Sequence, residues 1–159
     1  MSVETVKAYL ARYGASDRVM VFDVSSATVA LAAEAIGTQP ERIAKTLSFL
    51  GETGAIMVVA AGDARIDNPK FKATFHCKAK MLTAEQVPAL TGHPVGGVCP
   101  FDVPENARVW LDESLKRFAT VYPAAGSANS AVELTLAELE QFSKARGWVD
   151  VCKLMCNVQ

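Results

Sequence analysis

The sequence has little net charge, few histidines, no closely spaced cysteines and no long apolar run. A formal charge of −1 over 159 residues argues against a protein that binds DNA through its overall electrostatic field. The four cysteines form no Cys-x-x-Cys pair, and His76 and His93 are the only histidines, so we expect neither a zinc site nor another cofactor. No stretch approaches the roughly 18 apolar residues of a membrane-spanning helix, so we expect no membrane partner.

The composition is that of an ordinary globular protein. Half of the residues are hydrophobic and 21% are charged, and a chain of this length can bury a core without disulfides. We expect one domain over residues 1–159, with an N-terminal helix within 1–18 and a frayed tail at 155–159. Residues 1–7 lack the basic and apolar regions of a signal peptide, and free thiols in such a chain predict a cytoplasmic location.

Hydrophobic periodicity and capping residues predict short strands mixed with helices. The apolar run 55–61 indicates a buried strand, and Thr-Leu-Ala-Glu at 135–138 is a capping box that starts a helix reaching residue 146. A helix is expected at 27–36, capped by Ser25 or Ser26. Further strands are expected at 19–24, 45–50, 80–82, 107–111, 120–122, 131–134 and 148–154, and further helices at 67–75, 83–90 and 112–118. Because there is no regular βαβ alternation, we predict an α+β domain with a mixed, strongly curved, barrel-like sheet and helices packed around it.

The stretch 91–102 is the part of the chain that is richest in glycine and proline. Gly96 and Gly97 permit positive φ and a close approach of a ligand to the main chain, and Pro100 favours an extended Cys99. The stretch therefore predicts a rigid loop whose N–H groups form a nest for an oxygen atom with partial negative charge. Composition alone favours the alternative of an irregular surface loop.

Three segments in chain order carry a resemblance to a known family. They are 45–47 (Lys-Thr-Leu), the Gly-x-x-x-Pro signature at 96–100, and 122–134, which contains Gly-Ser-Ala-Asn-Ser. Together they resemble YbaK proteins and prolyl-tRNA synthetase editing domains over about residues 19–154. The resemblance implies a trans-editing deacylase that hydrolyses the ester of a mischarged small amino acid (alanine, serine, cysteine or threonine) on tRNA, by preference tRNA(Pro). It implies aminoacyl-tRNA as the partner, bound by its acceptor end, and leaves a synthetase partner open.

The resemblance also implies roles for individual residues. Lys45 falls on a lysine that binds the acceptor end in relatives and is needed for activity, and Thr46 beside it lines the substrate cleft. The backbone N–H groups of the signature loop, including those of Gly97, Val98 and Cys99, would hold the substrate carbonyl or ribose, and Glu133 matches a common glutamate whose role is open. The residues expected to act in catalysis are Lys45, Gly96, Gly97 and Pro100, and those expected to bind substrate are Thr28, Thr46, Val98, Cys99, Gly126, Asn129 and Ser130.

The residues offer no evident Ser-His-Asp or Cys-His set, so hydrolysis would use a positioned water activated by the substrate's own hydroxyl. We interpret His93 as a loop residue rather than a general base. Cys99 has two interpretations: a thiol of lowered pKa that acts as a nucleophile, or a small buried hydrophobe. Likewise, the lysines at 70, 72, 78 and 80 either contact tRNA phosphates or form a solvated face.

Some positions depart from the family pattern. Asp102 stands where many members have glycine, Ala124 where a cysteinyl-tRNA-clearing relative has serine, and Thr28 where that relative has an aromatic residue. These differences leave the edited amino acid open. They also leave an alternative function: a catalytically silent module of the same fold that binds a nucleotide or a CCA end.

Overall fold

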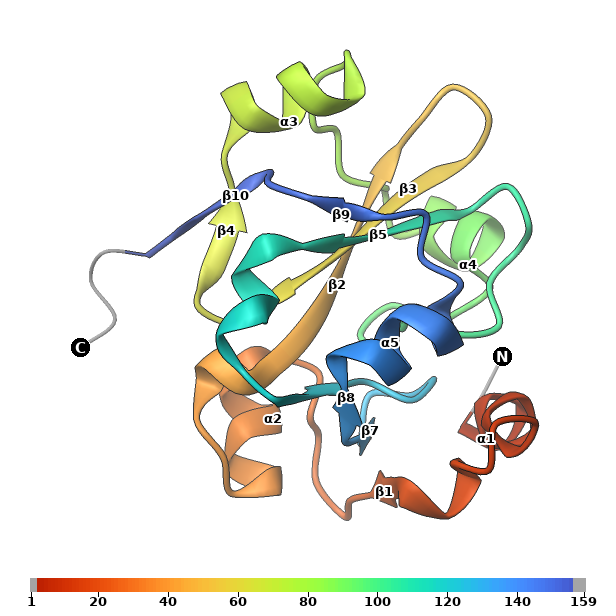
Figure 1. Cartoon of the computed structure of the whole chain (residues 1–159). Coiled ribbons are helices and arrows are strands. Elements are labelled where there is room, and N and C mark those ends of the chain that lie inside the picture. Colours follow the sequence, from red (N-terminus) through yellow and green to blue (C-terminus); the bar gives the residue numbers. More distant parts are fainter. Residues whose placement is uncertain (1–2, 156–159) are drawn as a thin grey trace.

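The computed structural model describes residues 3–155 (Figure 1). Expectations for residues 1–2 and for 156–159 of the tail lie outside the described residues. The centre of the fold is a six-stranded sheet in the order β8-β6-β2-β3-β5-β9. Its strands are β2 Ile43–Leu50, β3 Ala55–Ala61, β5 Arg108–Asp112, β6 Thr120–Pro123, β8 Leu134–Thr135 and β9 Trp148–Val149.

The sheet is mixed and strongly curved, which confirms the predicted fold class. β2 and β3 form an antiparallel hairpin, whereas β3 with β5, and β2 with β6, run parallel. Two further pairs of strands stand beside the sheet: β1 (Val19–Val21) with β7 (Ser130–Val132), and β4 (Ala64–Ile66) with β10 (Cys152–Leu154).

Helices surround the sheet, as Figure 1 shows. The α-helices are α1 Val3–Ala11, α2 Val29–Ile36, α3 Asn68–Phe75, α4 Gln86–Thr91 and α5 Leu136–Ser143, and the 3₁₀ helices are η1 Ser16–Arg18, η2 Pro40–Arg42 and η3 Glu113–Arg117. Within residues 3–155, no helix combines the length and the hydropathy needed to cross a membrane.

Local signals located several of these elements correctly. The strand expected at 55–61 is β3, and six of its seven residues are buried, as a central strand requires. The capping box predicted for α5 is present, because Thr135 and Glu138 each accept a backbone N–H bond from the other. Asp67 caps α3, with its side chain accepting from the N–H of Lys70.

Other boundaries were wrong for identifiable reasons. α2 begins at Val29 because Thr28, rather than Ser25 or Ser26, is its cap; the Thr28 hydroxyl accepts from the N–H of Leu31 at 3.1 Å. Strand β1 ends at Val21, before the end of the strand expected at 19–24. α5 ends at Ser143 because Lys144 adopts a left-handed φ of 55°.

The strand predicted over 148–154 is divided between two sheets. β9 pairs with β5, whereas β10 pairs with β4, so the chain changes partner between them. The N–H of Val151 donates at that point to the Asp112 carboxylate at 2.9 Å. The segments at 80–82 and 112–118 also differ from expectation: the first makes only an isolated bridge through Met81, and the second is the 3₁₀ helix η3.

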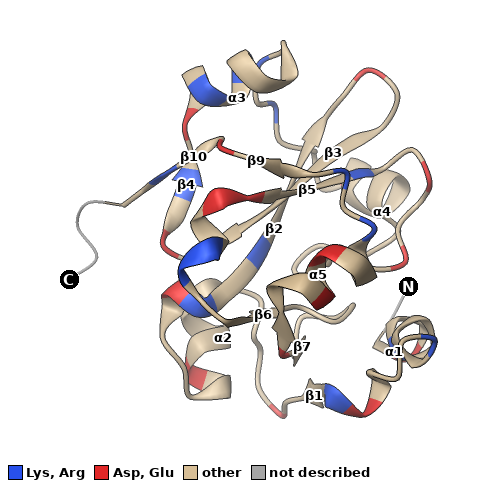
Figure 2. Ribbon diagram, viewed as in Figure 1, with Lys and Arg blue, Asp and Glu red and all other residues tan. Residues whose placement is uncertain are grey.

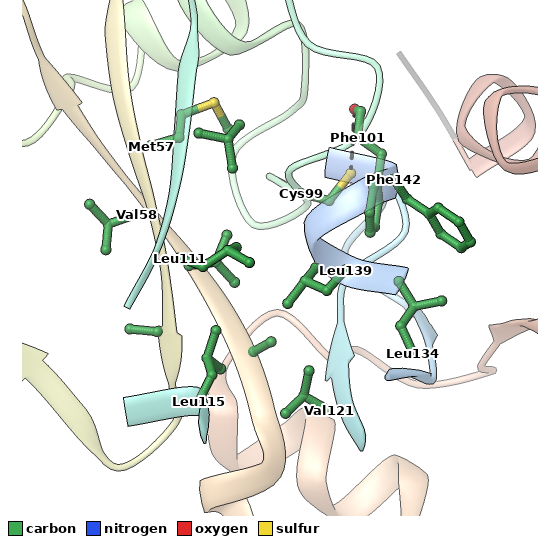
Figure 3. Close-up of a cluster of buried hydrophobic side chains, with 14 of the residues drawn as sticks. Met57, Val58, Cys99, Phe101, Leu111, Leu115, Val121, Leu134, Leu139 and Phe142 are labelled. Atoms are coloured by element: carbon green, nitrogen blue, oxygen red, sulfur yellow. Dashed lines mark hydrogen bonds between the residues drawn. The ribbon is translucent and has the colours of Figure 1, made fainter. Parts of the chain in front are cut away.

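The hydrophobic core lies where the sheet, α5 and the glycine-rich loop meet. Figure 3 shows Leu111, Leu115, Val121 and Leu139 converging on this space, together with the loop residue Cys99. All five side chains have 0% exposure. The loop is therefore anchored to the core through Cys99 and does not lie free on the surface.

Candidate functional site

A cavity of about 270 Å³ opens where β2, the start of α2 and the glycine-rich loop meet. Five residues expected to act in the site line it: Lys45, Thr46, Thr28, Gly96 and Val98. Its other lining residues are Ser26, Ala27, Val29, Ala32, Ile43, Ala44, Ser48, Met81, Val87, Val95, Tyr122, Ala124 and Ala131.

Strand β2 supplies the polar wall of the cavity. Ala44, Thr46 and Ser48 alternate along the strand and all line the cavity, while Leu47 and Phe49 pack against the core. The Thr46 Oγ1 atom is buried and has no hydrogen-bond partner within residues 3–155. A hydroxyl left in this state at a cavity wall is available to a ligand.

Lys45 is the only cationic residue that lines this cavity among the residues described. Its Nζ donates to the Gly62 carbonyl at 3.3 Å. Burial lowers the pKa of the Lys45 ammonium, and the neighbouring Cys152 and Asp63 oppose that shift. Asp63 is itself held by Arg117, whose Nη1 donates to Oδ2 at 2.9 Å. Lys45 forms no ion pair in the described part of the chain, so its charge is available to an anion.

The glycine-rich loop makes a tight turn at the cavity wall. The Gly97 N–H donates to the Pro94 carbonyl at 3.0 Å, and Gly96 has φ 85°, a combination typical of a type II turn. The expectation that the Gly97 N–H holds substrate is therefore wrong, because that group is used inside the loop. In the described residues, the N–H groups of Gly96 and Val98 donate to no protein atom.

Gly97 instead fixes the position of the loop. A Cβ added there would lie 2.8 Å from the Cα of Ser127, closer than real contacts allow. Gly97 therefore lets the loop pack directly on the backbone of the 126–130 turn, which is a structural role rather than contact with substrate.

The 126–130 turn packs against the glycine-rich loop and is held by hydrogen bonds of its own side chains. Ser127 Oγ lies 2.7 Å from Asn129 Oδ1 and 2.8 Å from Ser130 Oγ, and Asn129 Nδ2 donates to the Phe22 carbonyl at 2.9 Å. The expected substrate-binding residues Gly126, Asn129 and Ser130 do not line the cavity. Pro100 does not line it either, and faces a separate hollow beside Arg12.

Cys99 is a core residue. Its thiol is fully buried, and burial raises its pKa to about 12. The sulfur lies 3.5 Å from His93 Nε2, which is 2.7 Å from the Phe101 carbonyl. Burial lowers the pKa of His93 and favours the neutral imidazole. The nucleophile interpretation fails, because a thiol of raised pKa outside the cavity supplies no thiolate to a substrate.

Glu133 also has a structural place. It accepts from the Thr120 hydroxyl at 2.8 Å and lies 3.5 Å from Arg42. The sequence analysis missed Ser48, although its spacing of two from Thr46 placed both on one strand face. It also missed Met81 and Val95, two apolar residues at the cavity that are 59% and 61% exposed. No local sequence pattern identifies these two residues as part of a cavity, because both lie in loops.

The lining side chains restrict the chemistry that this cavity can perform. Of the described residues, no carboxylate, imidazole or thiol lines it, so the wall supplies none of the side chains that most often act as a general base at neutral pH. Residues 3–155 contain no cluster of three His, Cys, Asp or Glu side chains that could hold a metal ion. What the cavity offers is one cation, free N–H groups, hydroxyls and an apolar pocket.

Residues 24–142 match the profile of the aminoacyl-tRNA editing domain, and the chain belongs to that family. It is 52% identical to "Uncharacterized protein YwhH" of Bacillus subtilis (strain 168) over 154 residues, 96% of this chain and 98% of the relative. It is 31% identical to "Putative Cys-tRNA(Pro)/Cys-tRNA(Cys) deacylase EbsC" of Enterococcus faecalis, covering 64% of this chain and 63% of that protein. A solved structure, "Crystal structure of a putative trans-editing enzyme for prolyl tRNA synthetase", superposes with TM-score 0.85 at 29% identity over 95% of this chain and 96% of that one.

Proposed function

We propose that this chain works as one trans-editing domain that hydrolyses the ester of a mischarged small amino acid on tRNA(Pro). The observation that carries the proposal is the convergence of Lys45, Thr46 and the Gly96 turn on a small cavity in an aminoacyl-tRNA editing domain. The names of the Enterococcus relative and of the superposed structure support a deacylase that serves prolyl-tRNA synthetase.

Each part of the cavity has a matching part of an aminoacyl-tRNA end. The Lys45 ammonium pairs with a phosphate of the acceptor end. The N–H groups of Gly96 and Val98 donate to the ester carbonyl as it becomes an oxyanion. The apolar wall, which includes Ala124 and Ala131, encloses the amino-acid side chain.

Water is the nucleophile in this proposal, and a ribose hydroxyl of the substrate assists its attack. No carboxylate, imidazole or thiol lines the cavity in the described residues, so the assisting ribose hydroxyl relays the proton of the attacking water. The proton ends on the ribose oxygen that leaves as a hydroxyl when the ester C–O bond breaks. The ester is already activated, so positioning and oxyanion stabilisation are the contributions asked of the protein.

A deacylation panel tests the proposal. The protein is offered tRNA(Pro) charged in turn with Ala, Ser, Cys, Thr and Pro, with Lys45→Ala as the site variant and Lys153→Ala, an exposed lysine that does not line the cavity, as the surface control. We expect rapid loss of at least one non-cognate ester, a loss of rate of about 100-fold or more in Lys45→Ala, and none in Lys153→Ala.

The lack of a lining carboxylate, imidazole or thiol among the described residues also favours a second candidate, a silent module that binds the acceptor end without hydrolysis. No release of any ester, together with retained binding of the charged tRNA, would replace the deacylase by that module. Full activity in Lys45→Ala would remove the assigned role of the cation.

A further inference from the structure

Thr46 differs from the other threonines near the cavity because its hydroxyl has no partner. Thr28 uses its hydroxyl to cap α2, and Thr91 donates to the Val87 carbonyl at 2.6 Å. Thr46 Oγ1 is buried and unpartnered within the described residues. Since a buried hydroxyl without a partner is unfavourable, its retention at a cavity wall points to a ligand group that satisfies it.

The surroundings of Thr46 indicate which ligand group this is. Ser48 lies on the same strand face, about 7 Å further along, and is only 6% exposed. Most of the other residues that line the cavity are apolar, including Ile43, Val87 and Ala131. A small apolar pocket with two hydroxyls on one side is complementary to a short side chain that carries one polar atom.

We propose that Thr46, assisted by Ser48, makes the site selective for mischarged esters whose amino acid carries a hydroxyl or thiol, over alanine. This inference rests on the proposed deacylase function. A serine, threonine or cysteine side chain exchanges a hydrogen bond with Thr46 Oγ1, whereas the alanine methyl group leaves that oxygen unpaired. Sites built around such a bond reject the analogue that lacks the polar atom.

The alternative place for this hydrogen bond is the part of the substrate that all esters share, the α-ammonium group or the ester carbonyl. In that case removal of the hydroxyl lowers every rate by the same factor. The two possibilities therefore differ in the ratio of rates between substrates, and not in the rate for any single one.

The experiment measures kcat/KM for tRNA(Pro) charged with Ser, Thr, Cys or Ala, using the wild type and Thr46→Val. Valine keeps the branched shape and removes the oxygen. We expect the wild type to prefer its best polar substrate over alanine by roughly tenfold or more. In Thr46→Val the rate on that substrate falls by about tenfold, while the rate on the alanyl ester changes less than about twofold.

Two variants serve as controls. Thr46→Ser keeps the hydroxyl and retains the preference. Thr91→Val is the same substitution at a threonine that does not line the cavity, and lowers thermal stability through the lost hydrogen bond to Val87 without changing the ratio of rates. Far-UV circular dichroism establishes that each variant is folded.

The outcomes separate the two proposals. Equal loss of rate on all esters in Thr46→Val, or a wild type that prefers the alanyl ester, overturns the selectivity and leaves the deacylase standing. No hydrolysis of any ester by the wild type overturns the deacylase, and calorimetry then decides on selectivity. The ligands are the seryl and alanyl amides of 3′-amino-3′-deoxyadenosine. Tighter binding of the seryl amide than of the alanyl amide, lost in Thr46→Val, supports the selectivity. Equal binding of both amides overturns it.

Discussion

Lys45 and Cys99 show how burial acts in opposite directions on a cation and a thiol. Burial lowers the pKa of Lys45, which still reaches the cavity, and raises the pKa of Cys99, which does not reach it. In both cases the charged form is disfavoured by loss of water. Lys45 thereby becomes a partly desolvated cation ready to pair with an anion, whereas Cys99 remains a neutral, apolar filler of the core.

For the single residue Cys99, we predict that its thiol is dispensable for hydrolysis. Cys99→Ala leaves kcat/KM within about twofold and lowers the free energy of unfolding by roughly 1 kcal/mol, because a small cavity forms beside His93. Deacylation assays and urea unfolding measure the two quantities. A hundredfold fall in rate in a folded variant would restore the nucleophile interpretation.

The glycine-rich loop is the element on which the geometry of the site depends. The His93–Phe101 hydrogen bond joins its two ends, and Gly97 packs on the backbone of Ser127 near its middle. The Gly96 and Val98 N–H groups are positioned by these two attachments. Loop position, rather than any loop side chain, is therefore the property that substitution should disturb.

Gly97→Ala tests this dependence. The added Cβ would lie 2.8 Å from the backbone of Ser127, so the loop must move away from its support. We expect a destabilisation of roughly 1–3 kcal/mol and a fall in deacylation of about tenfold or more. Thermal unfolding and initial rates are the measurements.

Gly14→Ala is the matched control, because Gly14 has φ 72° but no atom within 4 Å of an added Cβ. That substitution carries only the backbone cost of roughly 1 kcal/mol and leaves the rate unchanged. Equal rates for the two variants would show that the position of the loop does not govern hydrolysis.

Residues of both charge signs are interspersed over the molecule (Figure 2), and several form ion pairs between segments distant in sequence. Arg18 of η1 bonds Glu138 of α5 at 2.8 Å, and Arg117 of η3 bonds Asp63 beside β3. Lys70, one of the lysines considered for tRNA contact, pairs with Asp150 at 3.0 Å. Four of the five ion pairs among the described residues join segments that are far apart in sequence.

These pairs predict how stability depends on pH. Arg18 and the backbone of Thr135 lower the pKa of Glu138 from 4.5 to about 2. A carboxylate whose pKa is lower in the folded state stabilises the protein above pH 4.5, and that contribution is lost as the pH falls toward 2. Urea unfolding across this range should show less acid sensitivity for Glu138→Gln than for the wild type. Glu34→Gln, an exposed control, should match the wild type.

Short-range patterns predicted those features of the fold that depend on neighbouring residues. The apolar run of β3 and the capping box of α5 are local, and both were located. The division of 148–154 depends on Asp112, which is distant in sequence, so no local pattern contained it. In the site, resemblance pointed to Lys45 and Thr46, and only packing could show that Gly97 contacts Ser127 instead of substrate.

The cavity wall is assembled from segments that lie far apart in the chain, from Ser26 before α2 to Ala131 in β7. A nascent chain that ends before β7 therefore has an incomplete binding site, whatever its local structure. A molecule bound in the finished cavity contacts all these segments together and acts as a reversible cross-link. By mass action it should raise the midpoint of thermal unfolding of the whole domain, so a shift of that midpoint reports occupancy for compounds that are never hydrolysed.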